Sequence, residues 1–161
     1  MRYFEDMKIG EVTHSSRSYK VTREEVIEFA SKYDPQPFHL DDDAARETFF
    51  GRLSASGWHT GAMTMRLMVE TWRDQEPTAS LGSPGIDELK WVKPVYPGDE
   101  IRVVMTLIAK RRMKSRSDMG LTKSRQEVFN QNDELVMRMV SNGLIKVRDP
   151  ETMTPDESLE D

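Results

Sequence analysis

The order of helical and strand patterns along the chain constrains its fold most. Helical spacing dominates the first half, where a long run from Gly57 to Trp72 is rich in Ala, Met and small residues and has few charges before Glu70. A helix of this composition is buried on most sides. The second half carries strand-like runs with turn residues between them, at 86–95, 100–114, 121–130 and 134–147. Helices followed by consecutive strands predict an α+β fold with an antiparallel sheet.

The length and composition of the chain exclude several classes of protein. At 161 residues it is long enough for one core and too short for two. It has no cysteine, which excludes disulfides, thiol catalysis and Cys-based metal sites, and His14, His39 and His59 are too scattered to predict a His-rich site. There is no apolar run of about eighteen residues, and Met1–Asp6 lacks an apolar signal core. We expect a metal-free cytoplasmic protein that is neither exported nor inserted in a membrane.

Charge is placed unevenly along the chain. Residues 149–161 hold six acidic side chains and no Lys or Arg, so we expect a domain at 1–148 and a mobile acidic tail at 149–161. Lys110–Arg116 is a basic cluster at the end of a predicted strand. It is either a solvated hairpin or a docking site in which Arg111 and Arg112 pair with the phosphates of a ligand. A near-neutral domain without interleaved aromatics does not favour nucleic acid as a partner.

The segment Tyr33–His39 places a carboxylate and an imidazole five residues apart, with two prolines between them. The preceding helical pattern begins with a capping box at Thr22 and should end near Tyr33, because proline disfavours helix in the residue before it. An extended loop can aim Asp34 and His39 at one spot, which a helix would not do at this spacing. Such a pair can serve as general base and general acid. The alternative is a helix stop followed by a structural histidine.

Gly57 opens the long helical run and is a second candidate site residue. A shorter acidic-started helical pattern at 40–50 precedes it and ends at Gly51. The free amides of a helix N-terminus can bind an anion or an oxyanion, and a glycine lets a carbonyl oxygen approach closely. The alternative is that Gly57 only allows the chain to turn into the helix.

Together these residues resemble a known family, the MaoC-like dehydratases, which include the (R)-specific enoyl-CoA hydratases. The resemblance covers residues 5–148 and includes the family's Pro-Val-x-Pro-Gly-Asp turn. The segments that carry it are Phe29, Tyr33–His39, Phe50-Gly51, Ala55-Ser56-Gly57 and Trp91–Glu100. Two positions differ from the usual pattern, because Gln36 stands where the hydratases usually carry Asn and Ser56 where many carry His.

The resemblance implies a hot-dog fold, in which a strongly bent antiparallel sheet wraps around a long central helix. It also implies roles for the site residues. Asp34 would be the base that activates water, His39 the acid, and the Gly57 N–H the donor that polarises the thioester carbonyl. Gln36 and Ser56 lie beside the reaction centre, where they would contact the substrate.

The expected activity is the hydration of a 2-enoyl-CoA to an (R)-3-hydroxyacyl-CoA, or the reverse dehydration. Coenzyme A would enter only as part of the acyl-CoA substrate, with no other cofactor, and its phosphates are the ligand that Arg111 and Arg112 would bind. A hot-dog acyl-CoA thioesterase and a non-catalytic acyl-thioester-binding subunit are the alternatives. We expect a homodimer or higher homo-oligomer, with the strand near 86–95 at the edge of the sheet.

Overall fold

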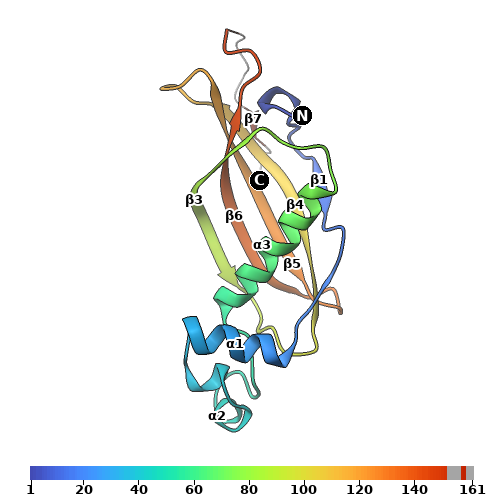
Figure 1. Cartoon of the computed structure of the whole chain (residues 1–161), viewed down its shortest axis with the longest axis vertical. Coiled ribbons are helices and arrows are strands. Elements are labelled where there is room, and N and C mark those ends of the chain that lie inside the picture. Colours follow the sequence, from blue (N-terminus) through green and yellow to red (C-terminus); the bar gives the residue numbers. More distant parts are fainter. Residues whose placement is uncertain (152–156, 159–161) are drawn as a thin grey trace.

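A curved antiparallel sheet wraps around a long helix in the computed structural model, which describes residues 1–151 and 157–158 (Figure 1). The helical elements are η1 (Phe4–Asp6), α1 (Arg23–Tyr33), η2 (Pro37–His39), α2 (Asp42–Arg46) and α3 (Gly57–Arg73). The strands are β1 (Val12–His14), β2 (Tyr19–Lys20), β3 (Ser80–Trp91), β4 (Glu100–Arg112), β5 (Met119–Phe129), β6 (Leu135–Lys146) and β7 (Glu157–Ser158).

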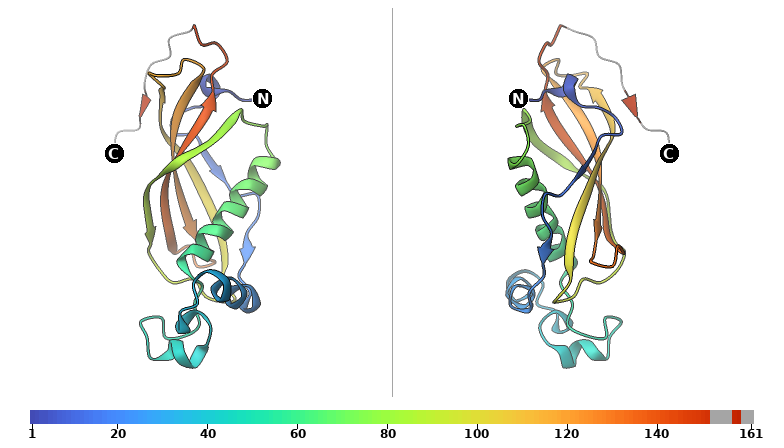
Figure 2. Two further views of the ribbon diagram at one scale, coloured as in Figure 1. Left: turned by 60° about the vertical axis from the view of Figure 1, so that its left-hand side comes forward. Right: turned by 90° about the vertical axis from the view of Figure 1, so that its right-hand side faces the viewer.

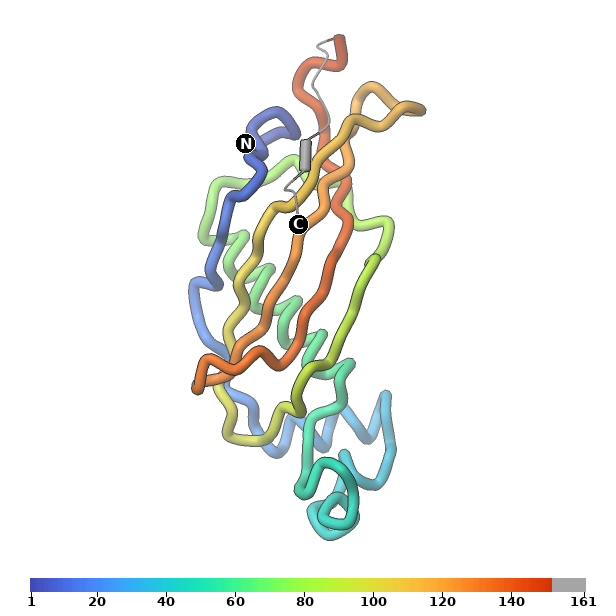
Figure 3. Tube along the Cα trace, turned by 180° about the vertical axis from the view of Figure 1, so that it is seen from behind, coloured from blue at the N-terminus to red at the C-terminus, as the bar shows by residue number. Residues whose placement is uncertain are grey.

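The strand order of the sheet is β1-β4-β5-β6-β3, and β2 and β7 also pair with β4. All of these pairings are antiparallel. α3 lies along the concave face, while α1 and α2 gather at one end of the molecule and the β4–β5 turn lies at the other (Figures 1 and 2). The view from behind shows the long strands side by side over α3 (Figure 3). The predicted α+β hot-dog architecture is therefore confirmed, and β3 forms an edge of the sheet.

The two helices that flank the predicted site loop begin at side-chain caps. The Thr22 hydroxyl accepts a hydrogen bond from the Glu25 amide at 3.3 Å, and α1 ends at Tyr33 as predicted. The Asp41 carboxylate caps α2 in the same way, but α2 ends at Arg46, so the helix predicted at 40–50 is shorter than expected. The Thr48 hydroxyl donates to the Ala45 carbonyl at 2.7 Å, and such local bonds compete with helix formation.

The largest error in the predicted elements concerns β3. The sequence predicts a strand at 86–95, after a Pro/Gly/Ser loop at 74–85, but the strand already begins at Ser80 and ends at Trp91. Gly82 and Gly85 adopt φ of 109° and 152°, and the pairing with β6 shifts register at both. Glycine permits these bulges, and proline is tolerated in an edge strand, so the residues that indicated a loop lie within an irregular strand.

The core fills the space between α3 and the concave face of the sheet. Leu67 of α3 packs there with Val103, Val128 and Met137, each of which is fully buried. A smaller cluster around Phe4 closes the far end of the sheet, next to the β4–β5 turn. α3 is thereby fixed along its length, which sets the position of its first turn. No helix within 1–151 or 157–158 is long and apolar enough to cross a membrane.

The acidic segment 149–161 is described in part. Residues 157–158 form β7, which pairs antiparallel with Ala109 and Lys110 of β4. Residues 152–156 and 159–161 lie outside the described residues, so the expectation of a mobile tail at 149–161 stays a prediction.

Candidate active site

The loop after α1 brings a carboxylate and an imidazole together. Asp34 is the C-cap of α1, and its amide donates to the Ala30 carbonyl at 2.9 Å. The chain then turns at Pro37 into η2, so His39 is presented by a short 3₁₀ turn and not by the extended loop that the sequence predicts. Proline suits the first position of such a turn, since its ring presets φ and the missing N–H has no helical partner to lose.

Asp34 and His39 face each other across a short gap. The His39 Nε2 atom lies 3.6 Å from Oδ2 of Asp34, which is too long for a hydrogen bond. The other ring nitrogen, Nδ1, lies 2.8 Å from the Ser54 carbonyl oxygen. A carbonyl can only accept, so Nδ1 carries a proton and Nε2 is the nitrogen available to a reacting molecule. His39 itself is buried, with 4% of its surface exposed.

Two side-chain donors fix the Asp34 carboxylate. The Ser56 hydroxyl donates to Oδ2 at 2.7 Å, and the Gln36 side-chain amide donates to Oδ1 at 2.7 Å. Burial acts to raise the pKa of Asp34, but these hydrogen bonds and the nearby His39 outweigh it, so the net pKa is lowered from its ordinary value. Asp34 is therefore ionised at neutral pH and fixed in orientation, as a general base must be.

The two positions that depart from the family pattern, Gln36 and Ser56, are thus the two partners of Asp34. The sequence predicts that both contact the substrate, which stays a prediction, and in the structure their side chains contact the carboxylate. Ser56 also caps α3, because its hydroxyl oxygen accepts from the Trp58 amide at 3.3 Å. One hydroxyl therefore connects the start of the helix to Asp34.

Gly57 is the first residue of α3, next to Ser56. Its amide lies at a helix position without an intrahelical acceptor, and no acceptor contacts it in the part of the chain that the structure describes. The indole of Trp91 covers the opposite side of this residue. A Cβ atom at position 57 would lie 2.4 Å from the Trp91 ring, and the Trp91 Nε1–H donates to the Gly57 carbonyl at 2.9 Å. Only glycine fits beneath this indole.

Trp91 is not identified as a site residue from the sequence, because it stands there only as the first residue of the segment with the turn motif. Its ring also meets that of Trp58 edge to face, with centroids 5.2 Å apart. A tryptophan before Val-Lys-Pro, at the end of an edge strand, is a signal that its ring could cover a neighbouring segment of the chain. Its partner, 34 residues earlier in the chain, could not have been named without the fold.

Arg111 and Arg112 are not brought to this site within the chain. They lie at the end of β4, and the β4–β5 turn is at the end of the molecule opposite to α1 (Figure 1). Arg112 donates to the carbonyls of Ser117 and Pro150, and the neighbouring Lys110 donates to the Met7 carbonyl. These contacts organise the hairpin. A role for the two arginines in binding coenzyme A stays a prediction.

The chain carries no group of three metal-ligating side chains within residues 1–151 and 157–158. Its site is a carboxylate–imidazole pair beside the N-terminus of a buried helix in a hot-dog fold. The chain belongs to the MaoC-like domain family, since the model of that domain matches residues 5–129.

Comparison with individual proteins agrees with this family. The uncharacterized protein YdeM of Bacillus subtilis (strain 168) is 27% identical over 142 residues, which is 88% of this chain and 97% of YdeM. The crystal structure of the MaoC-like dehydratase from Rhodospirillum rubrum has a TM-score of 0.83 at 38% identity, covering 92% of this chain and 99% of that one. The (R)-hydratase of A. caviae involved in PHA biosynthesis has a TM-score of 0.64 at 20% identity, covering 86% and 97%. At that identity the last comparison shows the fold alone.

Proposed function

We propose that this protein is a hydro-lyase that hydrates a 2-enoyl-CoA to an (R)-3-hydroxyacyl-CoA, or catalyses the reverse dehydration. The observation that carries the proposal is the Asp34–His39 pair, with Nε2 facing an oriented, ionised carboxylate across 3.6 Å. Addition of water to a double bond needs one group that removes a proton from water and one that protonates carbon, and this pair supplies both.

In the hydration direction Asp34 removes a proton from a water molecule as the oxygen of that water bonds to C3 of the enoyl group. The π electrons move toward the thioester, and C2 takes a proton from Nε2 of the His39 imidazolium. The Ser54 carbonyl accepts from Nδ1–H throughout. The proton on Asp34 then returns to Nε2, which restores the starting state. Dehydration follows the same steps in reverse.

The Gly57 amide stabilises the charge that develops on the thioester oxygen. It stands at the start of α3, where the helix dipole favours negative charge. Its N–H would stabilise the enolate-like transition state more than the ground state. Trp91 fixes the carbonyl of the same residue, and the Ser56 carbonyl, in the peptide unit that carries the Gly57 N–H, accepts from the Thr60 amide at 3.0 Å.

A homodimer, with sites at or near the subunit boundary, is part of the proposal. α3 carries apolar residues at the spacing of a helix–helix contact, of which Trp58, Ala62, Met65 and Trp72 are exposed and Val69 is half-buried. The neighbouring edge strand β3 exposes Leu81, Ile86 and Trp91. Apolar patches beside an unpaired strand edge mark an association surface. A monomer mass in light scattering at micromolar concentration would contradict the homodimer.

A cytoplasmic location and the lack of a further cofactor remain parts of the same proposal.

The experiment that tests the activity follows the enoyl-thioester absorbance of crotonyl-CoA together with release of free thiol. We expect the absorbance to fall with no thiol released, and Asp34→Asn to remove most of the change. Asp43→Asn, which alters an exposed carboxylate of α2, is the matched control. Thiol release without loss of the double bond would instead identify a thioesterase.

A further inference from the structure

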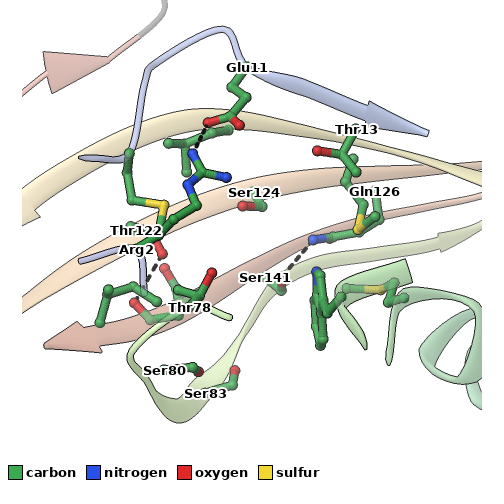
Figure 4. A pocket seen from close by; sticks show the side chains of 18 of the residues that line it. Arg2, Glu11, Thr13, Thr78, Ser80, Ser83, Thr122, Ser124, Gln126 and Ser141 are labelled. Atoms are coloured by element: carbon green, nitrogen blue, oxygen red, sulfur yellow. Dashed lines mark hydrogen bonds and ion pairs between the residues drawn. The ribbon is translucent and has the colours of Figure 1, made fainter. Parts of the chain in front are cut away.

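A cavity of about 540 Å³ lies between the second half of α3 and the concave face of the sheet (Figure 4). Met65 of α3 and Ile86 of β3 are among its lining residues. The same two elements carry Gly57 and Trp91 at the candidate active site. With a rise of about 1.5 Å per residue, Met65 lies roughly 12 Å along α3 from Gly57. The site and the cavity therefore lie along one seam between α3 and β3.

The floor of this cavity is polar where a hot-dog core would be expected to be apolar. Thr122, Ser124 and Gln126 alternate along β5 and face the cavity, and Ser141 of β6 is the register partner of Ser124 (Figure 4). Directly opposite residues of an antiparallel pair have adjacent side chains. These four side chains therefore form one continuous patch, here named the polar floor.

Part of the polar floor is satisfied within the protein. The Gln126 amide lies 2.9 Å from the Ser141 hydroxyl, and with its oxygen turned toward Ser141 its nitrogen reaches the Ser124 and Met139 carbonyls at 3.1 Å each. The Thr122 hydroxyl donates to the Gly143 carbonyl at 3.2 Å.

Several hydroxyls at the cavity remain available. The side chains of Ser124, of Thr13 on β1 and of Thr78 line the cavity, and none of these three hydroxyls has a hydrogen-bond partner among residues 1–151 and 157–158. A hydroxyl covered by an apolar group, with no partner, is unfavourable. The cavity therefore offers hydrogen bonds that a hydrocarbon alone would leave unmade.

The charges at the cavity do not suit an anion. Arg2 is the only cationic side chain among the lining residues, and its guanidinium is paired with Glu11 at 2.6 Å. Glu76 also lines the cavity. A carboxylate placed there would have to compete with Glu11 for Arg2 and would lie near two acidic groups. A neutral oxygen meets the free hydroxyls without this penalty.

We propose that the cavity receives the tail of the acyl thioester and selects tails that carry a neutral oxygen, as a hydroxyl or a carbonyl group. The proposal rests on the proposed function for the position of the thioester at Gly57. Ser124, at the centre of the polar floor, is the specificity-determining residue. The methionines Met65, Met68, Met105 and Met139 line the remainder of the cavity and adapt its shape to the hydrocarbon part of the chain.

The test is calorimetric binding of saturated CoA esters, which cannot turn over, to the whole protein. The probes are decanoyl-CoA, its analogue with a hydroxyl on the penultimate carbon, and its analogue with a terminal carboxylate. We expect the hydroxylated ester to bind about tenfold more tightly than either of the others, the effect of one hydrogen bond. Ser124→Ala should remove most of this preference. Ser31→Ala, which removes a hydroxyl from the exposed face of α1, should leave it unchanged.

Equal or tighter binding of the plain or carboxylated ester would overturn the proposal, as would a preference that survives in Ser124→Ala. Hydration of crotonyl-CoA, measured on the same preparation, separates this failure from failure of the proposed function. Hydration without any preference leaves the activity standing and removes the polar-tail inference. A preference without hydration would support the polar-tail inference and contradict the proposed activity, because the binding measurement needs no turnover.

Discussion

The two ends of α3 use polar groups in opposite ways. At its first turn the Asp34 carboxylate is held by Ser56 and Gln36 at 2.7 Å each, and His39 is fixed by the Ser54 carbonyl. At the cavity near its second half, Ser124 keeps a hydroxyl without a partner in the described chain. A group that moves a proton must be oriented in advance, whereas a group that selects a substrate must keep a hydrogen bond for it. The first turn of α3 therefore lies beside the groups that transfer protons, and its second half lies beside the group that selects the substrate.

The largest effect should come from the proton-transfer pair. Asp34→Asn and His39→Ala should each lower kcat for crotonyl-CoA by about 10² to 10⁴-fold. The double variant should lose little more than the worse single one, because the two groups act as a unit. Circular dichroism should remain native, since both residues lie outside the regular helices and strands of the core. Near-normal turnover in either variant would show that the first turn of α3 is not the reaction centre.

The next effect tests how Trp91 fixes Gly57. Gly57→Ala places a Cβ 2.4 Å from the indole, so the ring must move and the amide with it. We expect kcat to fall by about 10²-fold, the loss typical of one oxyanion donor, with a smaller change in KM. Trp91→Ala opens space for the added methyl group. The double variant should therefore be more active than the two single losses predict. Strict additivity would indicate that the indole does not determine the position of the amide.

A smaller effect is expected at Ser56, which joins the helix cap to Asp34. Ser56→Ala removes a hydrogen bond that lowers the pKa of Asp34, so this pKa should rise. The acidic limb of kcat/KM then moves to higher pH, and the protein loses about 1 kcal/mol of stability through the lost cap. Ser56→Thr keeps the hydroxyl and should restore both. An unchanged pH profile in Ser56→Ala would contradict the assigned role.

The basic cluster should contribute less than any group at α3. If Arg111 contacts the phosphates of coenzyme A, Arg111→Ala should raise KM for CoA esters a few-fold, and more at low salt than at high. A pantetheine ester, which lacks the distant phosphates, should be unaffected. Equal effects on both esters would assign Arg111 to the hairpin, where the structure places it far from Asp34 in the same chain.

The smallest expected effect is on stability. His59 is 6% exposed, its Nδ1 has no partner in the described chain, and its ring stacks on Phe29 at 4.7 Å. Burial lowers the pKa of His59, although Glu25 acts to raise it, so the unfolded chain takes up the proton first. Stability should be unaffected above the ordinary histidine pKa of about 6.5 and fall as pH drops below it. His59→Gln should reduce this fall in urea unfolding at pH 5 relative to pH 7.5.

The elements that were predicted well depend on local signals. Thr22 caps α1, and the long apolar run of α3 and the alternation in β4 are visible in the sequence alone. The start of β3 was missed because Gly82 and Gly85 indicate a loop unless the neighbouring strand is known. An edge strand tolerates bulges that a central strand does not, and edge position is a property of the whole sheet.

The features of the site also fall into those that local sequence motifs reveal and those that only the fold reveals. Asp34, His39 and Gly57 could be found because they lie in two short motifs. The contacts that fix them could not, because Ser56 reaches Asp34 across 22 residues and Trp91 reaches Gly57 across 34. The polar floor was equally hidden, since hydroxyls on a strand do not reveal which face of the sheet covers a cavity.

The most direct test of the central claim is analysis of the product formed from crotonyl-CoA in D₂O. We expect (R)-3-hydroxybutyryl-CoA with the thioester intact and solvent deuterium added at C2, formed at least about a hundredfold more slowly by Asp34→Asn. Release of free coenzyme A with the double bond retained, or unchanged substrate with the wild-type protein, would contradict the central claim.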